Sequence, residues 1–254
     1  MILQGDTGAV NSSGERHGRP HHPPIVILFP IYPGVTQLDF TGPHQVLSRL
    51  PGATPVVASM GGEPVAVEGF AFSGLERLEA VERCDVLCVP GGFGCLDAMR
   101  DPGYMAQIRR LAAGARYVTS VCTGSLILGA AGLLEGKRAA SHWAWRDELS
   151  LFGAIPDPGR VVRDGTVLTG GGVTAGIDFA LTLAAELADA TVAQSIQLGL
   201  EYAPAPPFDA GRPETAPAEV LALARARNAA RQPDRAAIIA QIAADRHLAR
   251  AATA

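Results

Sequence analysis

The chain has 254 residues, a net charge of −4 and 48% hydrophobic residues, values typical of a soluble globular protein. The negative charge gives no electrostatic reason to expect a nucleic-acid partner. No apolar stretch is long enough to span a bilayer, so we expect no membrane association either.

The four cysteines occur in a chain of this size without an apolar signal-peptide core. They therefore favour free thiols in a reducing cytoplasm over disulfides. The spacing of Cys84, Cys88 and Cys95 is not typical of a zinc site, and Cys88 lies within a buried-strand pattern. We expect a cytoplasmic protein whose cysteine cluster holds no metal.

The two ends of the chain differ in composition from its middle. Residues 1–23 are polar and rich in Gly, Ser, Arg and His, which predicts a disordered N-terminal extension, although its histidines would also suit a metal-binding tract. Residues 203–254 are Pro-rich and then Ala/Arg-rich, which predicts a helical C-terminal tail. Residues 24–202 remain as one domain with a sizeable core.

The middle segment alternates predicted strands with predicted helices. Apolar or β-branched runs predict strands over 24–29, 54–59, 85–89, 116–121 and 137–141, and glycine turns predict hairpins over 64–72 and 161–169. Helices are predicted over 41–50, 75–83, 104–113, 123–132, 142–152, 174–188, 191–200 and 235–251. This alternation predicts an α/β three-layer sandwich, with a mostly parallel sheet covered by helices on both faces.

Cys122 lies where a predicted buried strand passes directly into a predicted helix. In parallel α/β sheets, ligands bind at such carboxyl ends of strands. The first N–H groups of the helix and the helix dipole would stabilise a thiolate there, so we expect a lowered pKa and a reactive nucleophile. The segment Ser120-Val-Cys-Thr-Gly124 is also similar to the nucleophile elbow of hydrolases. The alternative is that Cys122 is a buried packing residue.

Several other residues suited to catalysis follow predicted strands. Asp39, between two apolar residues, is expected either to point inward with a raised pKa as an acid/base or to cap the following helix. Gly91 and Gly92 would offer free backbone N–H groups to a developing negative charge, or simply make a turn. Thr123 suits either a hydroxyl contact or a helix start. His142 would activate the thiol or pack as a hydrogen-bonded core residue.

Taken together, these residues resemble the ThiJ/PfpI superfamily of class-I glutamine-amidotransferase-like proteins over residues 24–202. The resemblance rests on Asp39 after the first strand, the turn Pro90-Gly91-Gly92, the elbow around Cys122, and Ser141-His142-Trp143. Within the superfamily, the segments 37–43, 121–126, 140–143 and 169–178 are most similar to isonitrile hydratases. The resemblance implies a flavodoxin-like fold, and it covers neither end of the chain.

The resemblance also implies a mechanism and a set of residues. Cys122, Asp39 and Thr123 would be catalytic, and Gly91, Gly92, Phe93 and His142 would bind the substrate or the developing charge. The substrate would be a small-molecule isonitrile, hydrated to an N-substituted formamide through a Cys122 thioimidate. No metal or other cofactor is required, and a homodimer is expected.

Two alternatives remain open from the sequence. The first is another chemistry of the same superfamily, of the amidase or glyoxalase type, in which His142 serves Cys122 as a base. The second is a non-enzymatic domain that senses a ligand or oxidation at Cys122. A transcription regulator would need a C-terminal helix-turn-helix region, and the Pro-rich residues after 202 do not have that pattern.

Overall fold

The computed structural model describes residues 24–251, with side chains described for 24–248. The prediction of a disordered extension or metal-binding tract over residues 1–23 lies outside the described residues. No helix in the described part of the chain is long and apolar enough to cross a membrane.

A sheet of seven strands forms the centre of the fold, in the order β10-β11-β7-β6-β1-β2-β5. Its strands are β1 Ile25–Pro30, β2 Ala53–Ser59, β5 Glu76–Arg77, β6 Val86–Val89, β7 Tyr117–Val121, β10 Val161–Asp164 and β11 Val167–Gly170. All pairings are parallel except that of β10 with β11. Two small two-stranded sheets lie outside it: β3 Val65–Val67 with β4 Phe70–Phe72, and β8 Arg138–Ala139 with β9 Ile155–Pro156.

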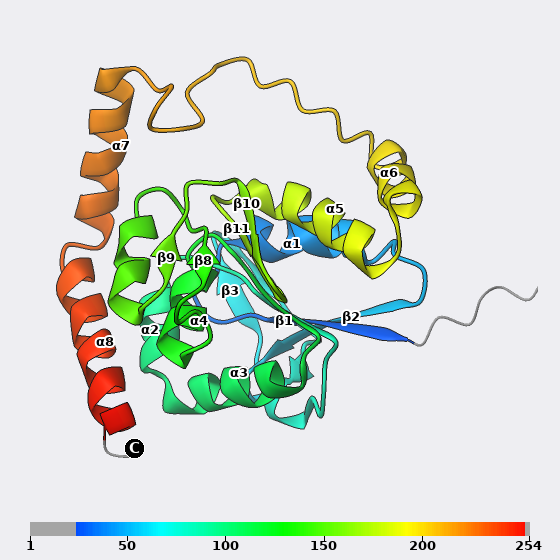
Figure 1. Cartoon of the computed structure of the whole chain (residues 1–254), viewed down its shortest axis with the longest axis horizontal. Helices are drawn as coiled ribbons and strands as arrows, with labels where there is room; N and C mark the ends of the chain where they lie inside the picture. Colours follow the sequence, from blue (N-terminus) through cyan, green and yellow to red (C-terminus); the bar gives the residue numbers. More distant parts are fainter. Residues whose placement is uncertain (1–23, 252–254) are drawn as a thin grey trace, which may run out of the picture.

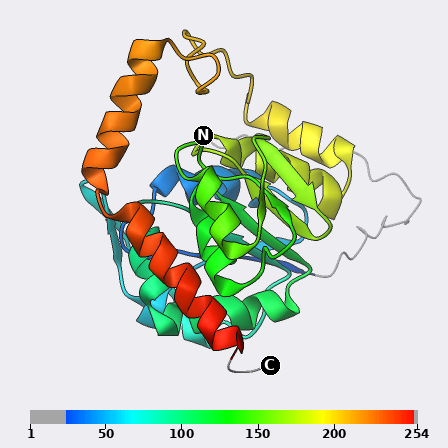
Figure 2. The same ribbon diagram turned by 60° about the vertical axis from the view of Figure 1, so that its left-hand side comes forward.

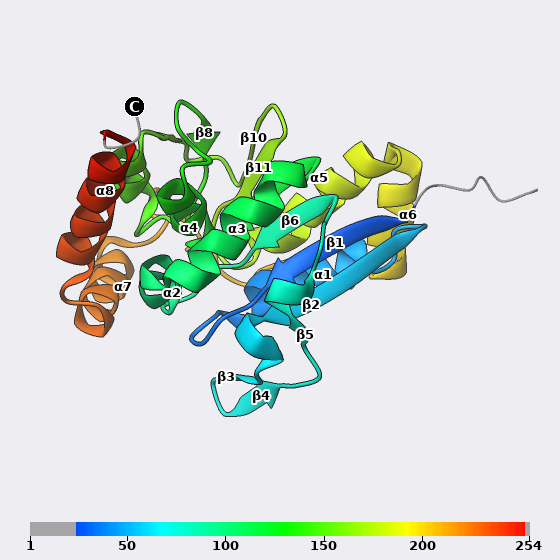
Figure 3. The same ribbon diagram turned by 90° about the horizontal axis from the view of Figure 1, so that it is seen from below.

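Helices cover both faces of this sheet (Figures 1 and 3). The α-helices are α1 Gln37–Leu47, α2 Cys95–Arg100, α3 Pro102–Gly114, α4 Gly124–Ala131, α5 Ala175–Leu187, α6 Ala190–Gly199, α7 Ala218–Arg231 and α8 Arg235–Ala251. Helices α1 and α5 pack together on one face, and α2, α3 and α4 lie on the other. The predicted three-layer α/β sandwich is confirmed. Helices bury the central strands on both sides, so the side chains on both faces of these strands are mostly apolar and form the core.

The start of α1 differs from the prediction. We expected Thr41 to cap this helix, but the helix begins at Gln37, with Thr36 at the N-cap and without a side-chain cap bond. Pro43 therefore lies inside the helix rather than in its first turn. The shift places Asp39 on the first turn, where the Asp39 N–H donates to the Thr36 carbonyl at 3.0 Å. Asp39 therefore does not cap the helix.

Three shorter segments also differ from prediction. The helix predicted over 75–83 is instead β5 followed by the 3-10 turn η2, Leu78–Ala80. The Arg110 guanidinium donates to the carbonyls of Leu78, Val81 and Glu82, which ties this segment to α3. The helix predicted over 142–152 shrinks to the 3-10 helix η3, Arg146–Phe152, and the strand predicted over 137–141 shrinks to β8.

The residues after 202 form two helices where the sequence predicted one. Helix α8 matches the predicted range, whereas α7 was not predicted, because it carries no fully buried side chain. Both helices lie along one edge of the domain, with α8 crossing the layer that contains α4 (Figures 1 and 2). Ile239 and Ala243 of α8 are buried in the hydrophobic core. The C-terminal tail therefore packs as part of the domain.

Candidate active site

The turn between β7 and α4 places Cys122 in a strained backbone conformation. Its φ is 57°, in the left-handed region that a side chain disfavours. The Cys122 N–H donates to the Gly170 carbonyl at 3.1 Å, and the Cys122 carbonyl accepts from the Ser125 and Ser141 hydroxyls, each at 3.0 Å. A Cβ on Gly124 would lie 2.1 Å from the Val89 carbonyl oxygen. These contacts hold a sharp elbow, as the sequence predicts.

Asp39 points inward from α1 to the thiol. Its side chain is fully buried, Oδ2 accepts from the Gly91 N–H at 3.0 Å, and Oδ1 has no hydrogen-bond partner within the described residues. Burial raises the pKa of Asp39 to about 7, and the nearby Cys122 thiol and the hydrogen bond from Gly91 limit the rise. The structure therefore supports the acid/base interpretation of Asp39.

The expected lowering of the Cys122 pKa is wrong. Burial raises the pKa of the thiol above its ordinary value, and the charge of Asp39 raises it further. The Thr123 N–H at the start of α4 does act in the predicted direction, but it is outweighed because Cys122 is almost completely buried. Cys122 and Asp39 consequently compete for one proton in a buried site.

Gly91 and Gly92 contribute less directly than predicted. The Gly91 N–H is taken by Asp39, and the Gly92 N–H donates to the Thr123 hydroxyl at 2.9 Å. The Thr123 hydroxyl in turn donates to the Gly92 carbonyl at 3.1 Å. The two glycine N–H groups therefore fix the Asp39 and Thr123 side chains and do not face a substrate as free donors. Within residues 24–251, the Phe93 N–H has no such partner, which leaves it available for a developing charge.

His142 is held as a neutral ring near the site. Its Nδ1 accepts from the Ala144 N–H at 3.2 Å, which assigns the proton of the neutral ring to Nε2. Burial lowers the pKa of His142, and the positive charge of Arg235 lowers it further. In the described part of the chain, no hydrogen bond joins His142 to Cys122. The ring is thus set up to donate from Nε2, and the base role for Cys122 receives no support.

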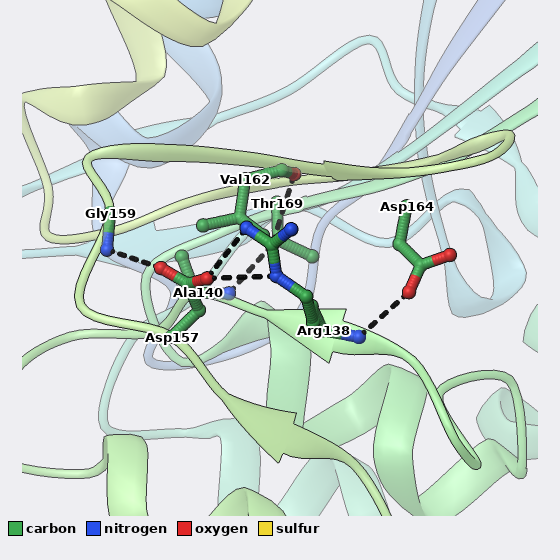
Figure 4. A network of polar contacts seen from close by, with 7 residues as sticks. All are labelled: Arg138, Ala140, Asp157, Gly159, Val162, Asp164 and Thr169. Atoms are coloured by element: carbon green, nitrogen blue, oxygen red, sulfur yellow. Dashed lines mark hydrogen bonds and ion pairs between the residues drawn. The ribbon is translucent and has the colours of Figure 1, made fainter.

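The strand that leads to His142 is fixed by a polar network (Figure 4). The Ala140 N–H donates to the Thr169 hydroxyl at 2.7 Å, and the Arg138 N–H donates to Asp164 at 2.9 Å. The Arg138 guanidinium also pairs with Asp157 at 2.8 Å. Segment 138–141 is therefore tied to the β10–β11 hairpin, which sets the position of the following His142.

A small pocket of about 70 Å³, open to solvent, reaches Cys122. Four of the predicted residues line it besides Cys122, namely Gly92, Phe93, Thr123 and His142. Asp39 and Gly91 are not among the residues that line the pocket. Within the described residues, no group of three His, Cys, Asp or Glu side chains could hold a metal ion.

The sequence analysis missed four residues of the pocket wall, Thr36, Trp145, Val173 and Asn228. Trp145 is buried beside Phe93, with ring centroids 6.2 Å apart. Thr36 and Val173 each lie between a predicted strand and the next predicted helix. Their position after a strand could therefore have indicated that they belong to the site. Asn228 belongs to α7, more than a hundred residues after Cys122, and no local pattern could assign it to the pocket.

The fold and this site define a class of protein with a cysteine elbow and an acidic partner. The DJ-1/PfpI family profile matches residues 26–186, and the chain belongs to this family. The chain is 54% identical over 206 residues to the isonitrile hydratase of Pseudomonas putida, covering 81% of this chain and 90% of that protein.

Solved structures agree with this assignment. A ThiJ/PfpI family protein from Pseudomonas syringae superposes with a TM-score of 0.83 at 40% identity, covering 93% of this chain and 97% of that one. DJ-1beta of Drosophila melanogaster has a TM-score of 0.64 at 27% identity, covering 71% of this chain and all of that one. The first match extends beyond residues 24–202, so the C-terminal helices have a counterpart there, which the sequence analysis did not find.

Proposed function

We propose that this protein is an isonitrile hydratase, a lyase that adds water to an isonitrile carbon and releases an N-substituted formamide. The observation that carries the proposal is the burial of the Asp39 carboxyl next to the Cys122 thiol, close enough for each group to shift the pKa of the other. An isonitrile, R–N≡C, must gain a nucleophile and a proton on the same carbon, and this pair holds both groups side by side. The 54% identity to the P. putida isonitrile hydratase supports the same reaction.

In the first half of the reaction, the Cys122 sulfur bonds to the isonitrile carbon. The proton shared by Cys122 and Asp39 moves to that carbon, and the product is the thioimidate R–N=CH–S–Cys122. The raised pKa of Asp39 makes its carboxylate basic enough to take this proton from the thiol near neutral pH and to deliver it to the carbon. The Phe93 N–H would stabilise negative charge that develops during the addition.

In the second half, Asp39 acts as a carboxylate and takes a proton from a water molecule that attacks the same carbon. The nitrogen receives a proton, and the adduct R–NH–CH(OH)–S–Cys122 collapses. The C–S bond breaks, R–NH–CHO leaves, and the Cys122–Asp39 pair recovers its proton. Overall, one isonitrile and one water give one formamide, and no redox step or cofactor is involved.

His142 and Thr123 have supporting roles in this scheme. Thr123 fixes Gly92 and therefore the position of the following Phe93 N–H, through contacts of 2.9 and 3.1 Å. His142 would donate from Nε2 to the bound substrate or to water, because its Nδ1 is already an acceptor. Amide hydrolysis or glyoxal chemistry would need His142 as the base, and its lowered pKa and missing contact with Cys122 argue against that assignment.

We also propose a location, an oligomeric state and partners for the enzyme. We infer a cytoplasmic protein, supported by four free cysteines that are all buried. We infer a homodimer, supported by large apolar side chains left exposed near the linker between α6 and α7, namely Leu198, Phe208, Val220 and Leu223. Nucleic acid is not an expected partner, because the net charge is −4. Sedimentation of the purified protein would test the homodimer.

Formamide release from cyclohexyl isocyanide tests the function. Wild-type protein is expected to form N-cyclohexylformamide, and Cys122→Ala and Asp39→Ala are expected to abolish it. Cys84→Ala is the matched control, because Cys84 is buried under α3 and contacts the Leu111 carbonyl instead of the site. His142→Ala is expected to retain part of the activity. Abolished turnover in His142→Ala with turnover kept in Asp39→Ala would overturn the assignment.

A further inference from the structure

The C-terminal helices are anchored on the wall of the active-site pocket. The Arg231 guanidinium lies 4.3 Å from the centre of the Phe93 ring, and the Gln232 side chain donates to the Phe93 carbonyl at 3.4 Å. The Arg235 guanidinium lies 4.6 Å from the centre of the Trp145 ring. Phe93 and Trp145 both line the pocket that contains Cys122. The tail thus holds two aromatic walls of the site.

Further contacts fix this arrangement. Arg235 pairs with Glu148 at 3.0 Å, and both side chains are mostly buried. Arg246, near the other end of α8, pairs with Glu135 at 3.0 Å. Between them, Ile239 is fully buried against the domain. A helix held at both ends and packed in the middle gives its neighbour α7 a defined position.

Asn228 is the residue that α7 contributes to the pocket. It lies three positions before Arg231 and four before Gln232, so the three side chains share one face of the helix end. Asn228 lines the same pocket as Cys122, and its carboxamide makes no hydrogen bond within the described residues. Among the other polar groups of the pocket, the Thr123 hydroxyl bonds Gly92 and His142 Nδ1 accepts from Ala144, whereas His142 Nε2 and the Thr36 hydroxyl make no hydrogen bond within the described residues.

Asn228 makes no hydrogen bond to Cys122, Asp39 or Thr123 within the described residues. The groups whose proximity shifts the pKa of the Cys122 thiol include Asp39 on α1 and the Thr123 N–H. The polar contacts of the C-terminal helices reach Phe93, Trp145 and Glu148 instead. When the isonitrile carbon is at Cys122, the substituent R therefore extends to the wall that Phe93, Trp145 and Asn228 form.

We propose that Asn228 is a specificity-determining residue, which hydrogen-bonds a polar atom on the R group of the isonitrile. The inference rests on the proposed function and adds a substrate class to it, namely isonitriles whose substituent combines an apolar body with a hydrogen-bonding group. The apolar body contacts Phe93, Trp145 and Val173, and the polar atom reaches the carboxamide. A carboxamide both donates and accepts, so hydroxyl and carbonyl substituents are equally suitable.

Paired substrates test this inference. Formamide release is measured with cyclohexyl isocyanide and with its 2-, 3- and 4-hydroxy derivatives, for wild type, Asn228→Ala and Asn228→Leu. For at least one hydroxy derivative, both variants should lose about 5- to 10-fold in kcat/KM, mainly through KM, as expected for one lost hydrogen bond. Turnover of cyclohexyl isocyanide should change less than about 2-fold, because its ring has no polar atom that Asn228 could hydrogen-bond.

Arg227→Ala is the matched control, because Arg227 precedes Asn228 on α7 and is exposed. It should leave the turnover of all four substrates unaffected. Equal losses on all four substrates in the Asn228 variants would overturn the proposal, because they would indicate a structural or reaction-centre role. No change on any substrate would overturn it as well.

A binding measurement separates this inference from the proposed function. Each isonitrile is tested for protection of Cys122 from alkylation by iodoacetamide, read as mass added to the Cys122 peptide. The responsive hydroxy derivative should protect wild type at lower concentration than it protects Asn228→Leu. If the proposed function fails, no variant produces formamide, whereas failure of the Asn228 inference leaves turnover intact and equal protection in both proteins.

Discussion

The Asp39 carboxyl and the Cys122 thiol are buried beside each other, and Asp39 Oδ2 accepts from the Gly91 N–H at 3.0 Å while Oδ1 has no hydrogen-bond partner within the described residues. Burial raises the pKa of both groups, so the pair keeps a proton in the neutral range where an isolated carboxyl would have lost it. One residue pair thereby supplies the nucleophile and the proton. The first two predictions follow from this coupling.

The pH dependence of turnover should report the pair. Above the Asp39 pKa of about 7, the pair carries one proton, which is the state that the addition step requires. We expect kcat/KM for cyclohexyl isocyanide to rise as pH increases through about 7 and to fall only above the ordinary thiol range, because the Cys122 pKa is raised. A profile that falls through neutral pH would contradict this assignment.

Asp39→Asn should change how stability depends on pH. The folded-state pKa of about 7 exceeds the ordinary value of 3.8, so the stability that Asp39 contributes is fully present below pH 4 and is lost as pH rises through 7. Wild type should lose up to about 1.4 kcal/mol per pH unit in this window, and Asp39→Asn should not. Urea unfolding at pH 5 and pH 8 measures the difference, which should favour the variant at the higher pH.

Gly91→Ala should inactivate the enzyme although it leaves the side chains of Cys122 and Asp39 unchanged. An added Cβ would lie 2.5 Å from the Thr123 nitrogen and 2.7 Å from Asp39 Oδ2, so both must move. Because small displacements at a reacting centre are costly, we expect a loss of about 100-fold or more in kcat. Gly114→Ala is the control, since its Cβ meets nothing within 4 Å. Similar activity in both variants would contradict the close approach.

Thr123→Val should separate the contribution of the Thr123 hydroxyl to activity from that of the side-chain volume. The hydroxyl bonds the Gly92 N–H and carbonyl at 2.9 and 3.1 Å, and valine removes both contacts while keeping the volume. We expect kcat to fall by about 10- to 100-fold, because the Phe93 N–H that follows is no longer fixed. Thr123→Ser should retain most of the activity. Stopped-flow measurement of formamide release with the three proteins checks this.

The parts of the fold that were predicted correctly are those with strong periodicity or turn signals. The buried strands, the Asp164-Gly165 hairpin and helix α5 all follow from local sequence. The elbow at Cys122 and the inward carboxyl of Asp39 were also predictable, because both follow apolar strands in a parallel sheet. The N-terminus of α1 was not, since Pro43 was taken as a first-turn residue although it lies a full turn further in.

The remaining errors come from interactions between distant segments. The thiol pKa depends on complete burial and on the charge of Asp39, which outweigh the helix N-terminus. The Gly92 N–H, which was expected to be free, donates to the Thr123 hydroxyl, 31 residues away. Asn228 reaches the pocket only because Arg231 and Arg235 attach the tail to aromatic rings of the domain. None of these pairings has a local sequence signature.

The parallel pairing of β6 with β7 sets Val89 opposite Ser120. Two residues follow each before the hydrogen-bonded pair of Gly92 and Thr123, so the two turns are matched in length. Inserting one residue into either turn would offset the pair by about 3.3 Å, farther than any hydrogen bond could stretch. The architecture of this site is thus encoded as a count of residues. A designer who transplants it to another parallel sheet must copy that count before choosing any side chain.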